Sequence, residues 1–197
     1  MNTDIIERNA AKVLTLFSLS PGSNFSRKEI KEKTMLHNIP LDNAIAMLLH
    51  NDIMKKERRL LFLNNRNRYA KSVVKILKEE FERFKELPLK IYYLLVDVSY
   101  MVAGVRNIGQ IYLFGSYAKL IHTQESDIDL AIILDKKKDR ETVDEVKGIV
   151  NKAEKKYGKT IECHFFEKSD LKKKDPLIKE ILRNNVALFK EESKKVT

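Results

Sequence analysis

The chain has 197 residues, 43% hydrophobic and 34% charged, which describes one or two globular domains with a heavily solvated surface and excludes a disordered chain. Its single cysteine, Cys163, excludes an internal disulfide, and because no charged leader with an apolar core opens the sequence, we expect a cytoplasmic protein. The net charge of +10 permits a polyanionic partner, either a nucleic acid or a nucleoside triphosphate, and is equally compatible with a lysine-rich solvated surface.

The first part of the chain begins with two predicted helices. Apolar residues recur at helical spacing from Ile5 to Phe17, until the segment SPGSN breaks the pattern. Ser26 and Glu29 then have the spacing of a capping box, in which each side chain satisfies a free backbone N–H at a helix start. The second helix is therefore expected to run from this box to about Thr34.

A third helix is predicted over residues 40–52, where Pro40 suits the first turn and leucines share one face. Two apolar runs, 53–56 and 60–63, flank the charged sequence KERR and predict a hairpin with a basic tip. Three helices and a hairpin resemble a winged helix-turn-helix domain over residues 5–66. DNA or RNA binding through phosphate contacts and a protein-docking role both stay open for this domain. The candidate nucleic-acid-binding residues are Lys55, Lys56, Arg58 and Arg59.

A connecting helix is predicted next, because apolar residues keep helical spacing from residue 67 to 87 and Pro88 ends or kinks the helix. We therefore expect an N-terminal domain over 1–66, a connecting helix over 67–88 and a second domain over 89–197.

Helices and strands alternate in the second domain, which predicts an α/β layer with helices packed on a sheet. The most apolar stretch, 91–105, contains Asp97 and is shorter than the roughly 20 residues of a membrane span, so we expect a buried helix and no membrane partner. The expected order is a helix over 89–106, a strand over 110–114, a helix after Gly115 and Ser116, a strand over 127–134, a helix over 140–156, a strand over 160–166 and a last helix in the segment DPLIKEILRNNVALF from Asp175.

Two aspartates on the second of these strands predict the chemistry. Residues i and i+2 of a strand point to one face about 6–7 Å apart, so Asp127 and Asp129 direct both carboxylates to one place. Such a pair favours bound cations, and two Mg²⁺ ions roughly 3.5–4 Å apart stabilise both oxygens of a phosphoryl transfer. Gly115 and Ser116 supply free N–H groups at a helix start, where phosphate binds, and Lys119 adds a cation. Taken alone, Asp-x-Asp also occurs at solvated strand edges, and Gly-Ser is a common turn.

The segment GSYAKLIHTQESDIDLAI, residues 115–132, closely resembles the DNA polymerase beta-like nucleotidyltransferases, in particular the minimal nucleotidyltransferases. Their pattern is Gly-Ser-x-Ala-Arg-Gly, a short spacer and Ser-Asp-x-Asp followed by apolar residues. The resemblance covers about residues 89–190. It implies a nucleotidyltransferase fold of the α/β (α+β) class with a mixed sheet flanked by helices. The matching residues are Gly115, Ser116, Ala118, Ser126, Asp127 and Asp129.

The resemblance implies an enzyme that moves a nucleoside monophosphate from a nucleoside triphosphate to an acceptor hydroxyl and releases pyrophosphate. Gly115, Ser116 and Lys119 would bind the nucleotide, while Asp127 and Asp129 would coordinate two Mg²⁺ ions, for which Mn²⁺ is a substitute. The family's third metal carboxylate lies on a later strand. The candidate for it is Glu162, which alternation places on one face with His164, and Asp135 is the next candidate if Glu162 points away.

The sequence departs from the family pattern at two positions. Lys119 replaces an arginine and loses the planar fork that binds phosphate bidentately, and Leu120 replaces a glycine. No His/Cys spacing predicts a further metal site, so packing or surface roles are expected for His122, Cys163 and His164.

Two alternatives to an active enzyme stay open. One is a nucleic-acid-binding regulator whose nucleotidyltransferase domain is catalytically silent. The other is an interaction protein, since the resemblance implies pairing with a helical protein partner, and some members are antitoxins that nucleotidylate a toxin. The acceptor stays open among nucleic acid, protein side chains, small alcohols and antibiotics.

Overall fold

The computed structural model describes residues 7–190, and the chain divides into two compact units between Tyr93 and Leu94. The expected start of the first helix, Ile5 and Ile6, lies outside the described residues. Between residues 7 and 190, no helix is both long and apolar enough to cross a membrane.

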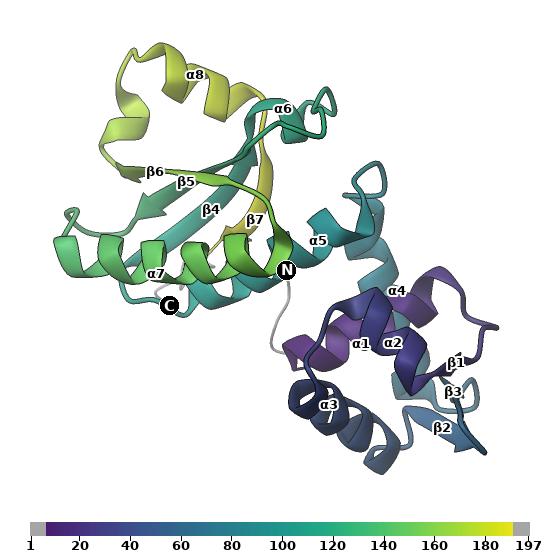
Figure 1. Cartoon of the computed structure of the whole chain (residues 1–197). Helices are drawn as coiled ribbons and strands as arrows, with labels where there is room; N and C mark the ends of the chain where they lie inside the picture. The colour runs from purple at the N-terminus through teal and green to yellow at the C-terminus, as the bar shows by residue number, and fades with distance from the viewer. Residues whose placement is uncertain (1–6, 191–197) are drawn as a thin grey trace, which may run out of the picture. The chain divides into compact units, whose positions relative to one another are not determined.

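The N-terminal unit contains the predicted three helices and hairpin (Figure 1). Ser26 and Glu29 form the expected capping box, in which the Ser26 N–H donates to Glu29 Oε2 at 2.7 Å and the Glu29 N–H donates to Ser26 Oγ at 3.3 Å. A short strand that the sequence analysis did not predict makes the hairpin an antiparallel sheet of order β1-β3-β2. The elements are α1 (Arg8–Leu19), β1 (Phe25–Ser26), α2 (Arg27–Thr34), α3 (Asn38–His50), β2 (Met54–Glu57), β3 (Leu60–Leu63) and α4 (Arg68–Glu82).

Helix α4, predicted as a connecting helix over 67–87, ends five residues earlier and packs on α1. Its residues Ala70 and Val73 are buried, so α4 contributes to the core of the N-terminal unit. The helix stops at Glu82 because the following segment folds into two tight turns, with N–H donation from Phe84 to Phe81 O at 2.8 Å and from Leu87 to Phe84 O at 2.9 Å. These turns bury the Phe84 and Leu87 side chains, and this burial outweighs the local helical preference.

The second unit holds the predicted mixed sheet. Its strand order is β6-β5-β4-β7, with β5 and β6 parallel and the other pairs antiparallel. The division between the units falls inside α5 (Leu89–Ala103). The remaining elements are β4 (Ile108–Phe114), α6 (Gly115–Ala118), β5 (Ile128–Leu134), α7 (Arg140–Tyr157), β6 (Ile161–Glu167), the 3₁₀ turn η1 (Asp170–Lys172), α8 (Pro176–Arg183) and β7 (Val186–Lys190).

The prediction of a single closing helix in the last segment is wrong at its C-terminal end. Helix α8 ends at Arg183, and the following residues form strand β7, antiparallel to β4. Strand β4 offers a row of unpaired backbone groups at the sheet edge, and β7 satisfies them. The sequence VALFK suits this role because its β-branched and aromatic residues favour a strand.

Alternation along the strands gives the sheet two different faces. Phe114 and Ala131 belong to one face, where they form an apolar cluster with Ile181 of α8. The next residues along β5, Leu130 and Ile132, point to the opposite face and are fully buried. Figure 1 shows α8 on one side of this sheet and α7 on the other. The site described below lies on the α8 face.

A buried ion pair joins α5 and α7. Asp97 Oδ2 accepts hydrogen bonds from Lys156 Nζ at 2.7 Å and from Tyr157 Oη at 2.6 Å. The Asp97 side chain is 8% exposed, so both contacts lie where water competes little. The single acidic residue in the most apolar stretch of the chain therefore fixes one helix against another.

Replacing Asp97 with alanine should lower the free energy of unfolding by about 2–3 kcal/mol, because the Tyr157 hydroxyl and the Lys156 ammonium lose a buried acceptor. Chemical denaturation measures the change. The control is Arg106→Ala, which removes an ion pair with Glu141 whose side chains are 81% and 83% exposed and should change stability by less than about 0.5 kcal/mol. Equal effects of the two substitutions would contradict the assignment.

Candidate active site

The register of the sheet brings Asp129 and Glu162 side by side. They are partners in the parallel pair of β5 and β6, and Phe114, the last residue of β4, is the partner of Asp129 on the other side. His164 follows Glu162 by two residues and points to the same face. Asp129, Glu162 and His164 each offer one ligand atom, and these three atoms lie within 4.8 Å of one another. We call these three residues the β5–β6 cluster.

Gly115 provides the space that the Asp129 carboxylate occupies. A Cβ atom at Gly115 would lie 2.0 Å from Asp129 Oδ2, far closer than a non-bonded carbon and oxygen can approach. The backbone of Gly115 is also left-handed, with φ +67°, which disfavours every residue with a side chain. A glycine at position 115 allows close approach of a phosphate, as the sequence predicts, and it also lets the chain turn at the end of β4 directly over the Asp129 carboxylate.

Helix α6, expected after Gly115 and Ser116, is a single turn of four residues that begins at Gly115 itself. A single turn sums few peptide dipoles, so its N-terminus attracts phosphate weakly. Half-buried Ser116 lies in this turn, next to Gly115. If Gly115 and Ser116 bind a triphosphate, the binding therefore depends on hydrogen bonds from individual N–H and hydroxyl groups of the turn and not on a helix dipole.

Negative charge converges on Asp129. Burial raises the pKa of Asp129, and the charge of Glu162 raises it further, while His164 acts in the opposite direction. The charges of Asp127 and of Glu180 on α8 add smaller increases to the same pKa. A nearby cation would stabilise the ionised form of a carboxylate that is partly buried and close to other negative charges. Two carboxylates and an imidazole together form a donor set that fits a divalent metal ion.

Asp127 is exposed and lies one residue before β5, outside the β5–β6 cluster. The turn in front of it is held by Lys159, whose Nζ donates to Gln124 O at 2.6 Å and to Ser126 O at 2.8 Å. The Ser126 hydroxyl accepts the Thr123 N–H at 2.8 Å. The serine of the Ser-Asp-x-Asp pattern therefore shapes the approach to Asp127.

Two other residues considered in the sequence analysis have partners of their own. Lys119, a candidate phosphate ligand, forms an ion pair with Glu180 of α8. Asp135 forms an ion pair with Lys168 at 2.6 Å and packs against Gly109, where a Cβ would lie 2.2 Å from Asp135 Oδ1. Six residues of strand separate Asp135 from Asp129, which corresponds to about 20 Å, so Asp135 takes no part in the β5–β6 cluster.

His164 is the residue of the cluster to which the sequence analysis gave no metal role. Its Nε2 lies 3.3 Å from Glu162 Oε1, and its ring meets the Phe114 ring edge to face, with centroids 5.4 Å apart. Spacing of histidines and cysteines could not reveal it, because its fellow donors are carboxylates, Glu162 on the same strand and Asp129 on the neighbouring strand. The available signal was alternation along β6, which already placed His164 on the face of Glu162.

The family pattern has a glycine at the position of Leu120, and the backbone conformation observed there is one that favours glycine. Leu120 has φ +59° and follows α6 in a Schellman arrangement, with N–H donation from Leu120 to Tyr117 O at 3.3 Å and from Ile121 to Ser116 O at 3.0 Å. Position C′ of this arrangement usually holds glycine because a left-handed backbone strains a residue with a Cβ.

Leu120→Gly should therefore raise the free energy of unfolding by about 0.5 kcal/mol, the relief of strain exceeding the entropy that glycine adds to the unfolded chain. The matched control is Leu182→Gly: Leu182 is 53% exposed and Leu120 52%, but Leu182 lies within α8, where glycine should cost about 1 kcal/mol. Urea denaturation distinguishes the two, and a loss of stability in both variants would contradict the prediction.

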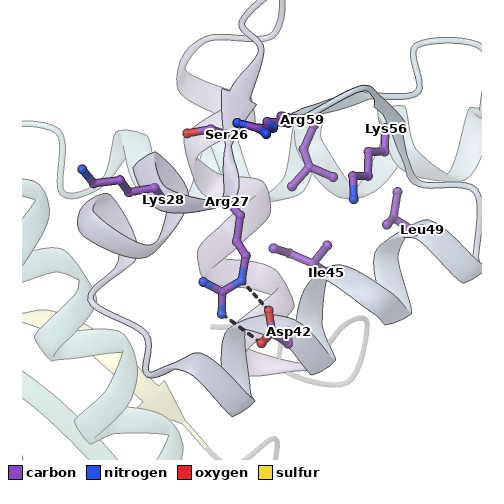
Figure 2. A pocket seen from close by; sticks show the side chains of 9 residues that line it. Ser26, Arg27, Lys28, Asp42, Ile45, Leu49, Lys56 and Arg59 are labelled. Carbon is purple, nitrogen blue, oxygen red and sulfur yellow. Dashed lines mark hydrogen bonds and ion pairs between the residues drawn. The ribbon is translucent and has the colours of Figure 1, made fainter.

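A basic groove of about 570 Å³ lies in the N-terminal unit (Figure 2). Its cations surround aliphatic side chains, among them Ile45 and Leu49 of α3. Arg27 is bound bidentately by Asp42, with Nε to Oδ1 at 2.6 Å and Nη2 to Oδ2 at 2.9 Å. The groove is lined by Ser26, Arg27, Lys28, Asp42, Ile45, Leu49, Lys56, Arg59 and Leu61.

The four candidate nucleic-acid-binding residues are all exposed on the hairpin. Lys56 and Arg59 line the groove, whereas Lys55 and Arg58 are not among its lining residues. The four residues therefore form two pairs of equal charge, one that lines the groove and one that does not.

Comparison with known proteins finds similarity for most of the second unit. A solved chain described as "Crystal structure of the toxin-antitoxin with AMP-PNP" is similar at 20% identity over 52% of this chain and 73% of that chain, with a TM-score of 0.34 that does not establish a common fold. No curated protein matches the chain. Residues 99–194 match the family described as "Polymerase beta, Nucleotidyltransferase". The match covers just under half of the chain, and this part of the chain is similar to a nucleotidyltransferase-type domain.

Proposed function

We propose that the second unit is a metal-dependent nucleotidyltransferase that transfers a nucleoside monophosphate from a nucleoside triphosphate to an acceptor hydroxyl. The observation that carries this proposal is the placement of Asp129 and Glu162 on neighbouring strands, directly beside the Gly115 turn. Paired carboxylates beside a glycine turn combine metal ligands with a place for phosphate, and residues 99–194 match a family described as a nucleotidyltransferase.

Asp129 and Glu162 are the proposed metal ligands, with Asp127 joining them from the turn before β5. Bound Mg²⁺ or Mn²⁺ would neutralise charge on the α-phosphate and on the attacking and leaving oxygens. Gly115 and Ser116 would bind the triphosphate through N–H and hydroxyl groups. Lys119 is paired with Glu180 in the structure, so it would have to leave Glu180 before it could bind a phosphate.

In the proposed reaction the acceptor oxygen bonds to the α-phosphorus while the bond from the α-phosphorus to the bridging oxygen breaks. Pyrophosphate leaves with that electron pair. The proton of the acceptor hydroxyl passes to Glu162, whose side chain is 60% exposed and is therefore the accessible base of the β5–β6 cluster. Asp129, half-buried and packed against Gly115, is held in place as a ligand.

The test is incubation of the full chain with α-labelled nucleoside triphosphates, Mg²⁺ or Mn²⁺, and acceptors from four classes: nucleic acid, protein, small alcohols and antibiotics. Label should move to one acceptor class only when metal is present, and pyrophosphate should appear in equal amount. Absence of both transfer and metal-dependent nucleotide binding would overturn the proposal.

For the N-terminal unit, we propose a winged-helix-type domain that binds the phosphates of DNA or RNA. The basic groove carries this second proposal, because Lys28 of α2, Lys56 of β2 and Arg59 of the hairpin turn are exposed there. Helix α3 presents Asp42, Ile45 and Leu49 to the same groove, a set without a basic side chain for reading bases. Binding is therefore expected to depend on salt and to be nearly independent of sequence.

Two charge-reversal pairs test this. Lys56→Glu with Arg59→Glu should weaken duplex binding and reduce the slope of log K against log salt by about 2, since each lost phosphate contact reduces it by about 1. Lys55→Glu with Arg58→Glu changes the net charge equally outside the groove. Equal losses in both pairs would show that only net charge matters. Binding that persists in a protein without transfer activity would favour a regulator with a silent catalytic domain.

A further inference from the structure

Building on the proposed function, we propose that His164 is a metal ligand and that its imidazole makes the site select Mn²⁺ over Mg²⁺. The sequence pattern of the family supplies carboxylates for this site, and the β5–β6 cluster adds a nitrogen donor to them.

The geometry of the cluster suits one ion bound by three residues. The ligand atoms of Asp129, Glu162 and His164 all lie within 4.8 Å of one another. Two donors on one ion, with bonds of roughly 2.0–2.3 Å, are separated by about 3–4.5 Å, so little movement is needed. His164 Nε2 lies 3.3 Å from Glu162 Oε1, which shows that the ring already directs this nitrogen to the carboxylate.

The surroundings of His164 hold its ring in this direction. The Phe114 ring packs against it at an interplanar angle of 66°, and the His164 side chain is 26% exposed. Its register partner on β5 is Ala131, whose small side chain leaves the imidazole room on the sheet surface. An oriented imidazole loses little conformational entropy on binding an ion, which favours a ligand role over a purely packing one.

The ion preference follows from the donor set. Mg²⁺ takes oxygen ligands in a nearly ideal octahedron and rarely accepts imidazole, whereas Mn²⁺ and later divalent ions of the first transition row accept nitrogen readily. A site with two carboxylates and one imidazole therefore binds Mn²⁺ more tightly than Mg²⁺, and the imidazole contributes to the difference.

The experiment measures Mn²⁺ binding to the full chain by electron paramagnetic resonance, followed by displacement with Mg²⁺. His164→Phe keeps a ring against Phe114 but removes the nitrogen, and should weaken Mn²⁺ binding at least about tenfold while changing Mg²⁺ binding much less. His164→Asp supplies an oxygen donor and should shift the affinity ratio toward Mg²⁺. Circular dichroism and thermal unfolding report whether each variant is folded.

His122→Phe is the matched control, because His122 stacks on the Tyr117 ring with centroids 4.2 Å apart and is not part of the cluster. It should leave Mn²⁺ binding unchanged. Unaltered Mn²⁺ affinity in folded His164→Phe would overturn the inference and leave the proposed function intact. Mn²⁺ binding that requires His164, in a protein with neither nucleotide transfer nor metal-dependent nucleotide binding, would support the inference and reject the function. Failure to bind Mn²⁺ at all would overturn the inference, whereas the proposed function is overturned only if Mg²⁺ also supports neither nucleotide binding nor transfer.

Discussion

Asp129→Asn is expected to reduce nucleotidyl transfer at least about 1,000-fold and to stabilise the metal-free fold. The loss of activity follows from removing a proposed metal ligand, since even one well-placed hydrogen-bond donor at a transition state contributes on the order of 10²–10³ in rate. Initial rates with α-labelled nucleotide at saturating metal measure it. Asp135→Asn, at the other end of β5, is the control and should retain transfer.

The stabilisation follows from the sign of the pKa shift. Burial and the charge of Glu162 raise the pKa of Asp129 above its ordinary 3.8, so the folded chain binds the proton more tightly than the unfolded chain. The contribution of this residue to stability is therefore present below pH 3.8 and is lost as the pH rises through the higher folded pKa. Asparagine carries no charge at any pH and avoids that loss. Denaturation at pH 7 without metal should show a higher midpoint for Asp129→Asn, and a lower midpoint would contradict the electrostatic account.

Gly115→Ala is expected to lower the free energy of unfolding by about 2–4 kcal/mol and to abolish transfer. Two effects add: the left-handed backbone strains an alanine, and its Cβ would lie 2.0 Å from Asp129 Oδ2. The Asp129 carboxylate must move away from this position. The substitution therefore displaces a proposed metal ligand and destabilises the fold at the same time. Chemical denaturation and transfer rates measure both consequences.

Three glycines separate these effects. Gly148→Ala, within α7 and with nothing within 4 Å of its Cβ, should stabilise the protein by about 0.5–1 kcal/mol. Gly158→Ala has the left-handed backbone, with φ +61°, but no neighbour within 4 Å, and should cost about 1 kcal/mol. Asp129→Ala removes the carboxylate that the new Cβ would meet. The double variant Gly115→Ala with Asp129→Ala should therefore regain the part of the lost free energy of unfolding that comes from this close contact. Additive losses would show that the carboxylate does not occupy this space.

The sequence by itself determined most helices and strands of the fold. Ser26 and Glu29 marked a helix start through local hydrogen bonds, and apolar periodicity separated helices such as α7 from strands such as β5. These features depend on residues a few positions apart. The same locality explains the errors: α4 ended early because Phe84 and Leu87 turn into the core, and β7 formed because β4 had an open edge. Neither cause is visible in a short window of sequence.

The sequence also named most of the candidate site, because Gly115 and Asp129 lie in a segment that resembles a family pattern and Glu162 was the candidate for its third carboxylate. Only the tertiary structure decided how they meet. The register of β5 against β6 placed Glu162 and His164 beside Asp129, and it left Asp127 at the exposed end of its strand and Asp135 about 20 Å away. Strand alternation fixes which face a side chain occupies, but the pairing of strands far apart in the chain sets which side chains become neighbours, since that pairing depends on the packing of the whole sheet.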